Sequence, residues 1–86
     1  MDISIELTLT PLQDNFEPPI QEFIKALRAS KYTVLENPLS TQIYGEYDGI
    51  MSLLTSQIKQ SLGRMDNGLL TMKIVKTDRS DYEPDF

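Results

Sequence analysis

The sequence predicts a single α+β domain in which two strand–helix–strand units follow each other, giving the element order βαββαβ. Three observations support this order: apolar and polar residues alternate over residues 2–10, two segments carry helical stripes of apolar residues, and turn-forming residues separate the segments. The 86 residues suffice for one domain. Apolar residues make up 40% of the chain and charged residues 24%, which is typical of a globular protein.

The first strand is expected over residues 2–10, which read DISIELTLT. The strict alternation places apolar side chains on one face and polar side chains on the other, as in a half-buried strand. Pro11 has no N–H group to give to a neighbouring strand and is expected to end the element. The apolar face consists of Ile3, Ile5, Leu7 and Leu9.

The first helix is expected over residues 18–30. Asp14 or Asn15 could cap it, and Pro18 and Pro19 suit its first turn, where the backbone N–H groups have no partner within the helix. The apolar residues recur at i, i+3, i+4 and i+7, so they form one stripe. This stripe consists of Ile20, Phe23, Ile24 and Leu27.

Two further strands follow the first helix. Tyr32 and Val34 belong to a short second strand that ends at the turn Asn37-Pro38. The third strand covers residues 39–47, and its alternation does not indicate which face is inward. One face holds Leu39, Thr41, Ile43, Gly45 and Tyr47, and the other holds Ser40, Gln42, Tyr44 and Glu46.

The second helix is expected from Asp48, a candidate cap, to Gly63, a candidate stop. Its apolar stripe consists of Ile50, Met51, Leu54, Ile58 and Leu62. After a turn at residues 66–68, the fourth strand covers residues 69–76. In this strand Leu70, Met72 and Ile74 lie opposite Thr71, Lys73 and Val75.

Right-handed crossovers close these elements into an antiparallel sheet with strand order 4-1-3-2 and both helices on one face. This is the ferredoxin-like arrangement. The predicted domain covers residues 1–79, and residues 80–86 form an acidic C-terminal tail without periodicity.

The composition argues against several functional classes. The chain has no cysteine for a disulfide, a thiolate nucleophile or a thiolate metal site, and no histidine, the commonest general base. We therefore expect a protein that is not an enzyme and that holds no metal or cofactor. The net charge is −5, and the eight Lys and Arg residues form no basic stripe, so we expect neither a nucleic-acid partner nor an anionic membrane surface.

The N-terminal residues Met1 and Asp2 do not begin a secretory signal, and no apolar run approaches the roughly 20 residues of a membrane span. We expect a cytoplasmic protein.

The open face of the predicted sheet is polar but carries few lysines. Glu6 and Lys73 could form a cross-strand ion pair in water. Alternatively, Glu6, Lys73 and Glu46 could form a polar network buried against a second subunit, or the face could contact a ligand directly.

The helix-facing side offers a second candidate site, because Thr41 and Gly45 are smaller than usual core residues. They could leave a cavity that contains the Thr41 hydroxyl. Alternatively, Gly45 marks a β-bulge and Thr41 packs as a small strand former. The turn Asp66-Asn67-Gly68 lacks the carboxylate spacing of a calcium loop.

The segment NPLSTQIYGEYD (residues 37–48), together with ISIELTLTPL near the start and KIVKTDR near the end, resembles the small thiamine-binding, YkoF-like proteins. The resemblance covers about residues 1–79. It implies a ferredoxin-like, non-enzymatic protein that binds thiamine or its hydroxymethylpyrimidine moiety and assembles as a homodimer or homotetramer. The matching positions are Thr8, Pro11, Asn37, Ser40, Thr41, Gly45, Glu46 and Asp48.

An aminopyrimidine needs acceptors for its amino group, donors for its ring nitrogens and a flat surface for stacking. A thiazolium ring would also favour a carboxylate or an aromatic face. Residues with these properties, added to the positions implied by the resemblance, make the candidate ligand-binding set: Thr8, Asn37, Ser40, Thr41, Gln42, Tyr44 and Glu46.

Two other functions remain open from the sequence. The chain could be a small oligomeric interaction or regulatory domain whose sheet pairs with another protein and which retains no ligand. It could also be a hydrolase or isomerase that uses Glu46 and Lys73 as an acid–base pair, which would require a strongly shifted pKa in a cleft.

Overall fold

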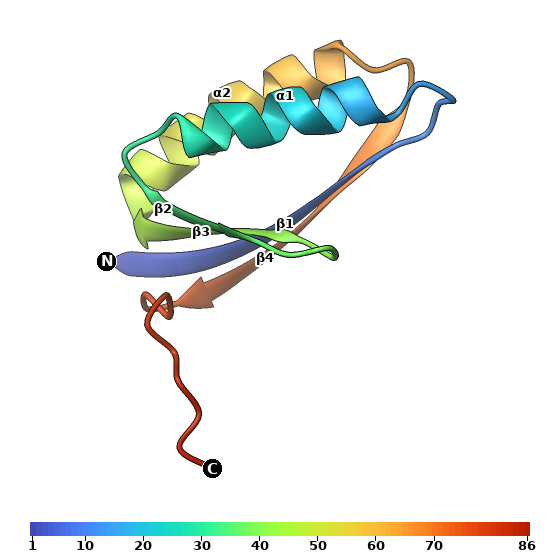
Figure 1. Ribbon diagram of the computed structural model, residues 1–86. Coiled ribbons are helices and arrows are strands. Elements are labelled where there is room, and N and C mark those ends of the chain that lie inside the picture. Colours follow the sequence, from blue (N-terminus) through green and yellow to red (C-terminus); the bar gives the residue numbers. More distant parts are fainter.

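A computed structural model describes the whole chain, residues 1–86. Four strands form one antiparallel sheet and two helices pack on one of its faces (Figure 1). The elements are β1 (Asp2–Pro11), α1 (Glu17–Arg28), β2 (Thr33–Glu36), β3 (Thr41–Glu46), α2 (Tyr47–Gly63) and β4 (Gly68–Lys76). The sheet order is β2-β3-β1-β4, so the ferredoxin-like prediction is confirmed.

The central strand β1 extends beyond its neighbour β3. It pairs with β3 only from Asp2↔Glu46 to Leu7↔Thr41, but with β4 as far as Pro11↔Gly68. Residues 8–11 therefore have a strand partner on one side only. On the other side, the edge of β1 is unpaired beyond the end of the β2–β3 hairpin.

The core lies between the sheet and the helices. Ile3, Ile5 and Leu7 of β1 are buried as predicted, whereas Leu9 is only half-buried and Ser4 on the other face is also buried. The burial of Ile43 at 0% exposure identifies the inward face of β3. Each Ile or Leu side chain buried in this way contributes about 1.5–3 kcal/mol. The core consists of Ile3, Ile5, Leu7, Phe23, Leu27, Ile43, Ile50 and Leu54.

The start of α1 differs in part from the prediction. Proline occupies its opening positions as expected, but the residue before the helix is Phe16, which makes no side-chain capping hydrogen bond. Neither Asp14 nor Asn15 caps the helix, because the helix begins at Glu17 and the cap position falls on Phe16.

The cap of α2 was also assigned to the wrong residue. The helix begins at Tyr47, and the carboxylate of Glu46 accepts a hydrogen bond from the backbone N–H of Gly49 (3.0 Å). Asp48 lies in the first turn, where its negative charge interacts favourably with the positive N-terminal end of the helix dipole.

The apolar stripe of α2 was predicted correctly except at its end. Leu62 is 44% exposed, and Ser61 is buried in its place. Met72 and Ile74 lie on the helix-facing side of β4 but are 38% and 46% exposed. They remain exposed because neither helix packs closely on β4.

Candidate functional site

A cavity of about 170 Å³, which we call the notch, lies between α1, the second half of β1 and the tip of the β2–β3 hairpin. A cavity of roughly 150 Å³ can hold benzene, so the notch has room for one six-membered ring. None of its lining residues carries a charge. Its floor is apolar and consists of Leu7, Leu9, Ile20, Phe23 and Ile24.

The notch exists because the β2–β3 hairpin turns back before β1 ends. The Asn37 N–H donates to the Ser40 C=O (3.1 Å), and the Asn37 Oδ1 atom accepts from the N–H groups of Leu39 and Ser40 (2.8 and 2.9 Å). The side chain of Asn37 therefore holds the turn, and the strand that would cover Leu9 is missing.

The backbone of Leu9 faces this gap. On the β3 side, the backbone C=O of Met1 accepts a hydrogen bond from the N–H of Tyr47. On the β4 side, the backbone C=O of Asp2 accepts one from the N–H of Thr77. The backbone N–H and C=O groups of successive residues point to opposite sides of a strand, so those of the odd-numbered residues of β1 point toward β3. The N–H and C=O groups of Leu9 thus point toward the notch, at a position where β3 has ended.

Hydroxyl groups surround the notch. Thr41 is 7% exposed and its hydroxyl makes no side-chain hydrogen bond within the chain, whereas Thr8 Oγ1 donates weakly to the Leu39 C=O (3.4 Å). Ser40 Oγ donates to a carboxylate oxygen of Glu6 (3.0 Å).

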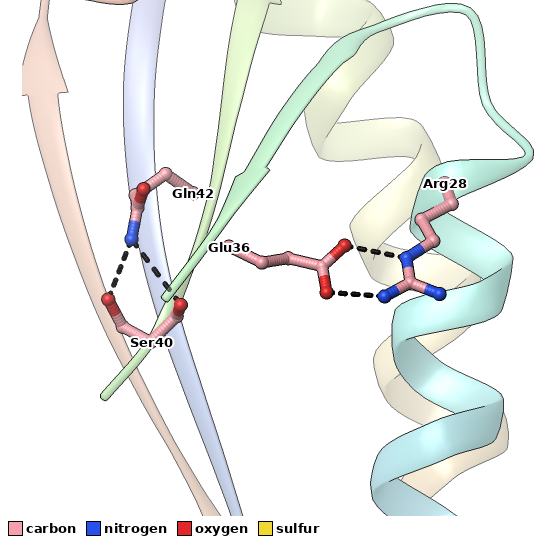
Figure 2. A network of polar contacts seen from close by, with 4 residues as sticks. All are labelled: Arg28, Glu36, Ser40 and Gln42. Carbon is pink, nitrogen blue, oxygen red and sulfur yellow. Dashed lines mark hydrogen bonds and ion pairs between the residues drawn. The ribbon is translucent and has the colours of Figure 1, made fainter. Parts of the chain in front are cut away.

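Ser40 connects the notch to the open face of the sheet. The side-chain amide of Gln42 donates to the Ser40 hydroxyl (2.8 Å) and more weakly to its carbonyl (3.4 Å) (Figure 2). Glu6 lies directly opposite Lys73, as predicted, but no ion pair joins them. The carboxylate of Glu6 instead leans toward the hairpin.

A second hollow of about 170 Å³, the open-face depression, lies on the sheet side away from the helices. Lys73 and Arg79 are its cations, and neither forms an ion pair. Its lining also includes Ser4, Glu6, Gln42 and Tyr44.

The structure thus separates the candidate ligand-binding residues. Thr8, Asn37, Ser40 and Thr41 line the notch, while Gln42 and Tyr44 line the open-face depression. Glu46 belongs to neither hollow.

Glu46 is engaged at the start of α2. Hydrogen bonds from the backbone N–H groups of Gly49 and Asp48 lower the pKa of its carboxyl below the ordinary value. Glu46 lies opposite Asp2 and Lys73 lies opposite Glu6, so the structure does not bring together the Glu46–Lys73 acid–base pair, nor the network of Glu6, Lys73 and Glu46.

The cavity predicted beside Thr41 and Gly45 is present only on the Thr41 side. The ring of Tyr32 fills the space at Gly45, where an added Cβ would lie 2.7 Å from the ring atom Cδ1. The Ile3↔Gly45 pair is in regular register, so Gly45 does not mark a bulge.

Sequence reasoning missed the backbone of Leu9 and the part of the floor contributed by Ile20 and Phe23. The available signal was the difference in length between the first strand and the later hairpin. This signal could be recognised only with the register between β1 and β3, which the local sequence pattern does not contain.

No cluster of three or more Asp or Glu residues could hold a metal ion. No helix combines the length and apolar character that crossing a bilayer requires.

Together the fold and the two hollows define a small ferredoxin-like α+β domain. No family model matches the chain, and no curated protein matches it. Among solved structures, protein SP2199 from Streptococcus pneumoniae is 26% identical, with a TM-score of 0.84 over 91% of this chain and 89% of that chain.

Two more distant structures share the fold. A candidate thiamine biosynthesis or salvage protein from Thermotoga maritima is 14% identical, with a TM-score of 0.78 over 86% of this chain and 82% of that chain. A DUF77 domain of unknown function from Bacillus cereus is 12% identical, with a TM-score of 0.73 over 99% of this chain and 79% of that chain.

Proposed function

We propose that this chain is a non-enzymatic, cytoplasmic small-molecule binding protein that carries or senses thiamine or its hydroxymethylpyrimidine moiety. The notch is the observation on which the proposal rests. The resemblance to YkoF-like proteins and the fold shared with the Thermotoga protein support this ligand class.

The notch complements the edge of an aminopyrimidine. A ring nitrogen accepts a hydrogen bond and the adjacent amino group donates one, whereas Leu9 offers one N–H donor and one C=O acceptor that point the same way. The apolar floor, including Phe23, suits the ring faces, and the free hydroxyl of Thr41 can serve the remaining polar atoms.

A charged group beside the notch supports whole thiamine as a ligand, in addition to its hydroxymethylpyrimidine moiety. The 170 Å³ volume holds one ring, so the thiazolium of thiamine would extend outside. There the carboxylate of Glu6, held by Ser40, lies close enough to attract a cation.

The lining also supports binding without chemistry. It contains no titratable side chain, so a ligand in the notch meets no general acid, base or charged nucleophile. The proposal therefore assigns no catalytic residue.

We also propose that the chain forms a homodimer or homotetramer. All nine residues of β4 are at least partly exposed, and its outer edge has no strand partner. Long exposed edges of this kind pair readily with another chain. The same edge favours the alternative function, an oligomeric interaction or regulatory domain without a ligand.

Calorimetry with thiamine and with 4-amino-5-hydroxymethyl-2-methylpyrimidine tests the proposal. We expect micromolar or tighter binding of at least one of them. Thr41→Leu, which fills the notch, should abolish the heat of binding without changing the oligomeric state, and Thr71→Val on exposed β4 is the matched control. If the folded wild-type protein gives no heat with either compound, the ligand proposal is wrong and the interaction domain is favoured.

A further inference from the structure

The C-terminal segment is anchored at its root and free beyond it. Ser4 Oγ donates to the Thr77 C=O (2.7 Å) and accepts from the Arg79 N–H (2.9 Å). Asp78 Oδ1 accepts from the Ser80 N–H (2.9 Å). Thr77 has φ +84°, a left-handed conformation that is unusual for a residue with a Cβ. The folded domain therefore sets the direction in which the following residues leave.

Residues 81–86, which we call the free tail, leave the sheet on the side opposite the helices and run away from it (Figure 1). A single backbone bond, from the Tyr82 N–H to the Arg79 C=O (3.1 Å), turns the chain at the start of this segment. Tyr82 is 69% exposed and Phe86 is fully exposed. The domain therefore covers neither aromatic ring of the free tail.

The open-face depression complements the free tail in charge. The free tail contains Asp81, Glu83 and Asp85 and no basic residue. The depression has two unpaired cations, Lys73 and Arg79, and its single acid leans toward Ser40.

Two other acids of this sheet face, Asp2 and Glu46, lie opposite each other at the next cross-strand position on this face beyond Ser4 and Tyr44. Glu46 is engaged there as the cap of α2. Tyr44 and the half-buried Val75 add apolar surface beside the two cations, which suits an aromatic ring.

We propose that the free tail of one copy binds the open-face depression of a second copy. Binding within one chain is disfavoured, because the fixed root directs the tail away from its own sheet and Arg79 lies only two residues before Asp81. The six residues of the free tail span about 20 Å when extended. Four strands are about 14 Å across, so the free tail can cross a partner's sheet. The inference does not require a ligand in the notch.

Fluorescence anisotropy of a labelled peptide with the sequence SDYEPDF (residues 80–86), titrated with the full-length protein, tests the docking surface. We expect saturable binding that weakens as salt rises from about 50 to about 500 mM. Lys73→Glu/Arg79→Glu should weaken binding about tenfold or more. The control Lys25→Glu/Lys59→Glu makes the same change in net charge on the helices and should leave affinity within about twofold of wild type.

Sedimentation of full-length variants tests whether docking joins two copies. The face variant Lys73→Glu/Arg79→Glu and the tail variant Asp81→Lys/Glu83→Lys/Asp85→Lys should each self-associate less than wild type. Their mixture should associate again, because each supplies the complement of the other. The control Lys25→Glu/Lys59→Glu makes the same change in net charge as the face variant but keeps both the tail and the face, so it should self-associate as wild type does.

Three results would overturn the inference. These are no saturable peptide binding, equal effects of the face and helix reversals, or no recovery of association in the mixture of face and tail variants. Loss of ligand binding in the notch would leave all three measurements unchanged, so the two proposals fail separately.

Discussion

Arg28 in the last turn of α1 and Glu36 on β2 form a two-pronged ion pair, with both guanidinium-to-carboxylate distances at 2.6 Å (Figure 2). The pair connects the C-terminal end of a helix to an edge strand that has a neighbour on one side only. The contact is bidentate, which favours Arg over Lys at this position.

We predict that this pair makes stability depend on pH in mild acid. Hydrogen bonding to Arg28 lowers the pKa of the Glu36 carboxyl below its ordinary value of 4.5. The pair therefore contributes stability above the unfolded-state pKa, and the contribution is lost as pH falls through the folded-state pKa. The difference in thermal midpoint between wild type and Glu36→Gln should be present at neutral pH and should vanish in strong acid.

The Lys25–Glu22 pair supplies the control for this measurement. Its atoms are 4.0 Å apart and both side chains are mostly exposed, so Glu22→Gln should show almost no difference at any pH. Equal pH profiles for the two variants would contradict the prediction.

The reassigned cap of α2 gives a second prediction. Glu46→Ala removes the acceptor for the Gly49 N–H and should lower the thermal midpoint, because a helix N–H then loses its partner. Asp48→Ala removes only a charge near the helix dipole and should have a smaller effect. Circular dichroism melts of both variants compare them directly, and a larger loss in Asp48→Ala would favour Asp48 as the cap.

A third prediction concerns Gly45, which has φ +155° and faces the ring of Tyr32. Gly45→Ala should destabilise the fold by about 1–3 kcal/mol, because the new methyl group overlaps the ring and the backbone conformation suits glycine. Gly63 at the end of α2 has no atom near its added Cβ, so Gly63→Ala is the control and should be neutral or stabilising. Chemical denaturation measures both, and equal stabilities would rule out the crowding argument.

A fourth prediction concerns the anchor of the C-terminal segment. Ser4→Ala removes two hydrogen bonds and leaves the Arg79 N–H and the Thr77 C=O without their partner. We expect a loss of about 1–2 kcal/mol and faster hydrogen exchange at Arg79. Exchange at Ile5 in the core should change only through global stability. Unchanged protection of Arg79 would show that Ser4 does not hold this segment.

A fifth prediction follows from a hydroxyl without a partner. Ser61 Oγ is buried in α2 and makes no hydrogen bond. Ser61→Ala removes the unpaired polar atom and raises helix propensity, so we expect stabilisation by about 0.5–1.5 kcal/mol. The exposed Ser52→Ala changes propensity alone and should gain less. Denaturant titration of both variants separates the two effects, and a loss of stability in Ser61→Ala would be inconsistent with an unpaired hydroxyl.

The sequence predicted the order of the elements because their periodicities are local. The alternation over residues 2–10 and the stripes of both helices need no knowledge of distant residues. The opposition of Glu6 and Lys73 was predicted because the sheet order and the inward faces together place them on neighbouring strands.

The helix caps and the candidate site were harder to predict. Glu46 and Asp48 are both acids that can cap, and only the backbone direction at the end of β3 selects Glu46. Gly45 suggested empty space, but the distant ring of Tyr32 occupies it. Thr41 was predicted to lie at a cavity, and Ser40 was a candidate only through the family resemblance. The backbone of Leu9 became a candidate only when the lengths of two neighbouring strands could be compared.

The most extensive strand pairing in this domain joins residues 2–11 to residues 68–76, near opposite ends of the chain. During synthesis on a ribosome, the first strand emerges long before the last one and can find only β3 on one side. Non-local pairing of this kind slows folding, because the intervening loop must close first. The second edge of the nascent N-terminal strand therefore stays uncovered until residues 68–76 have been synthesised.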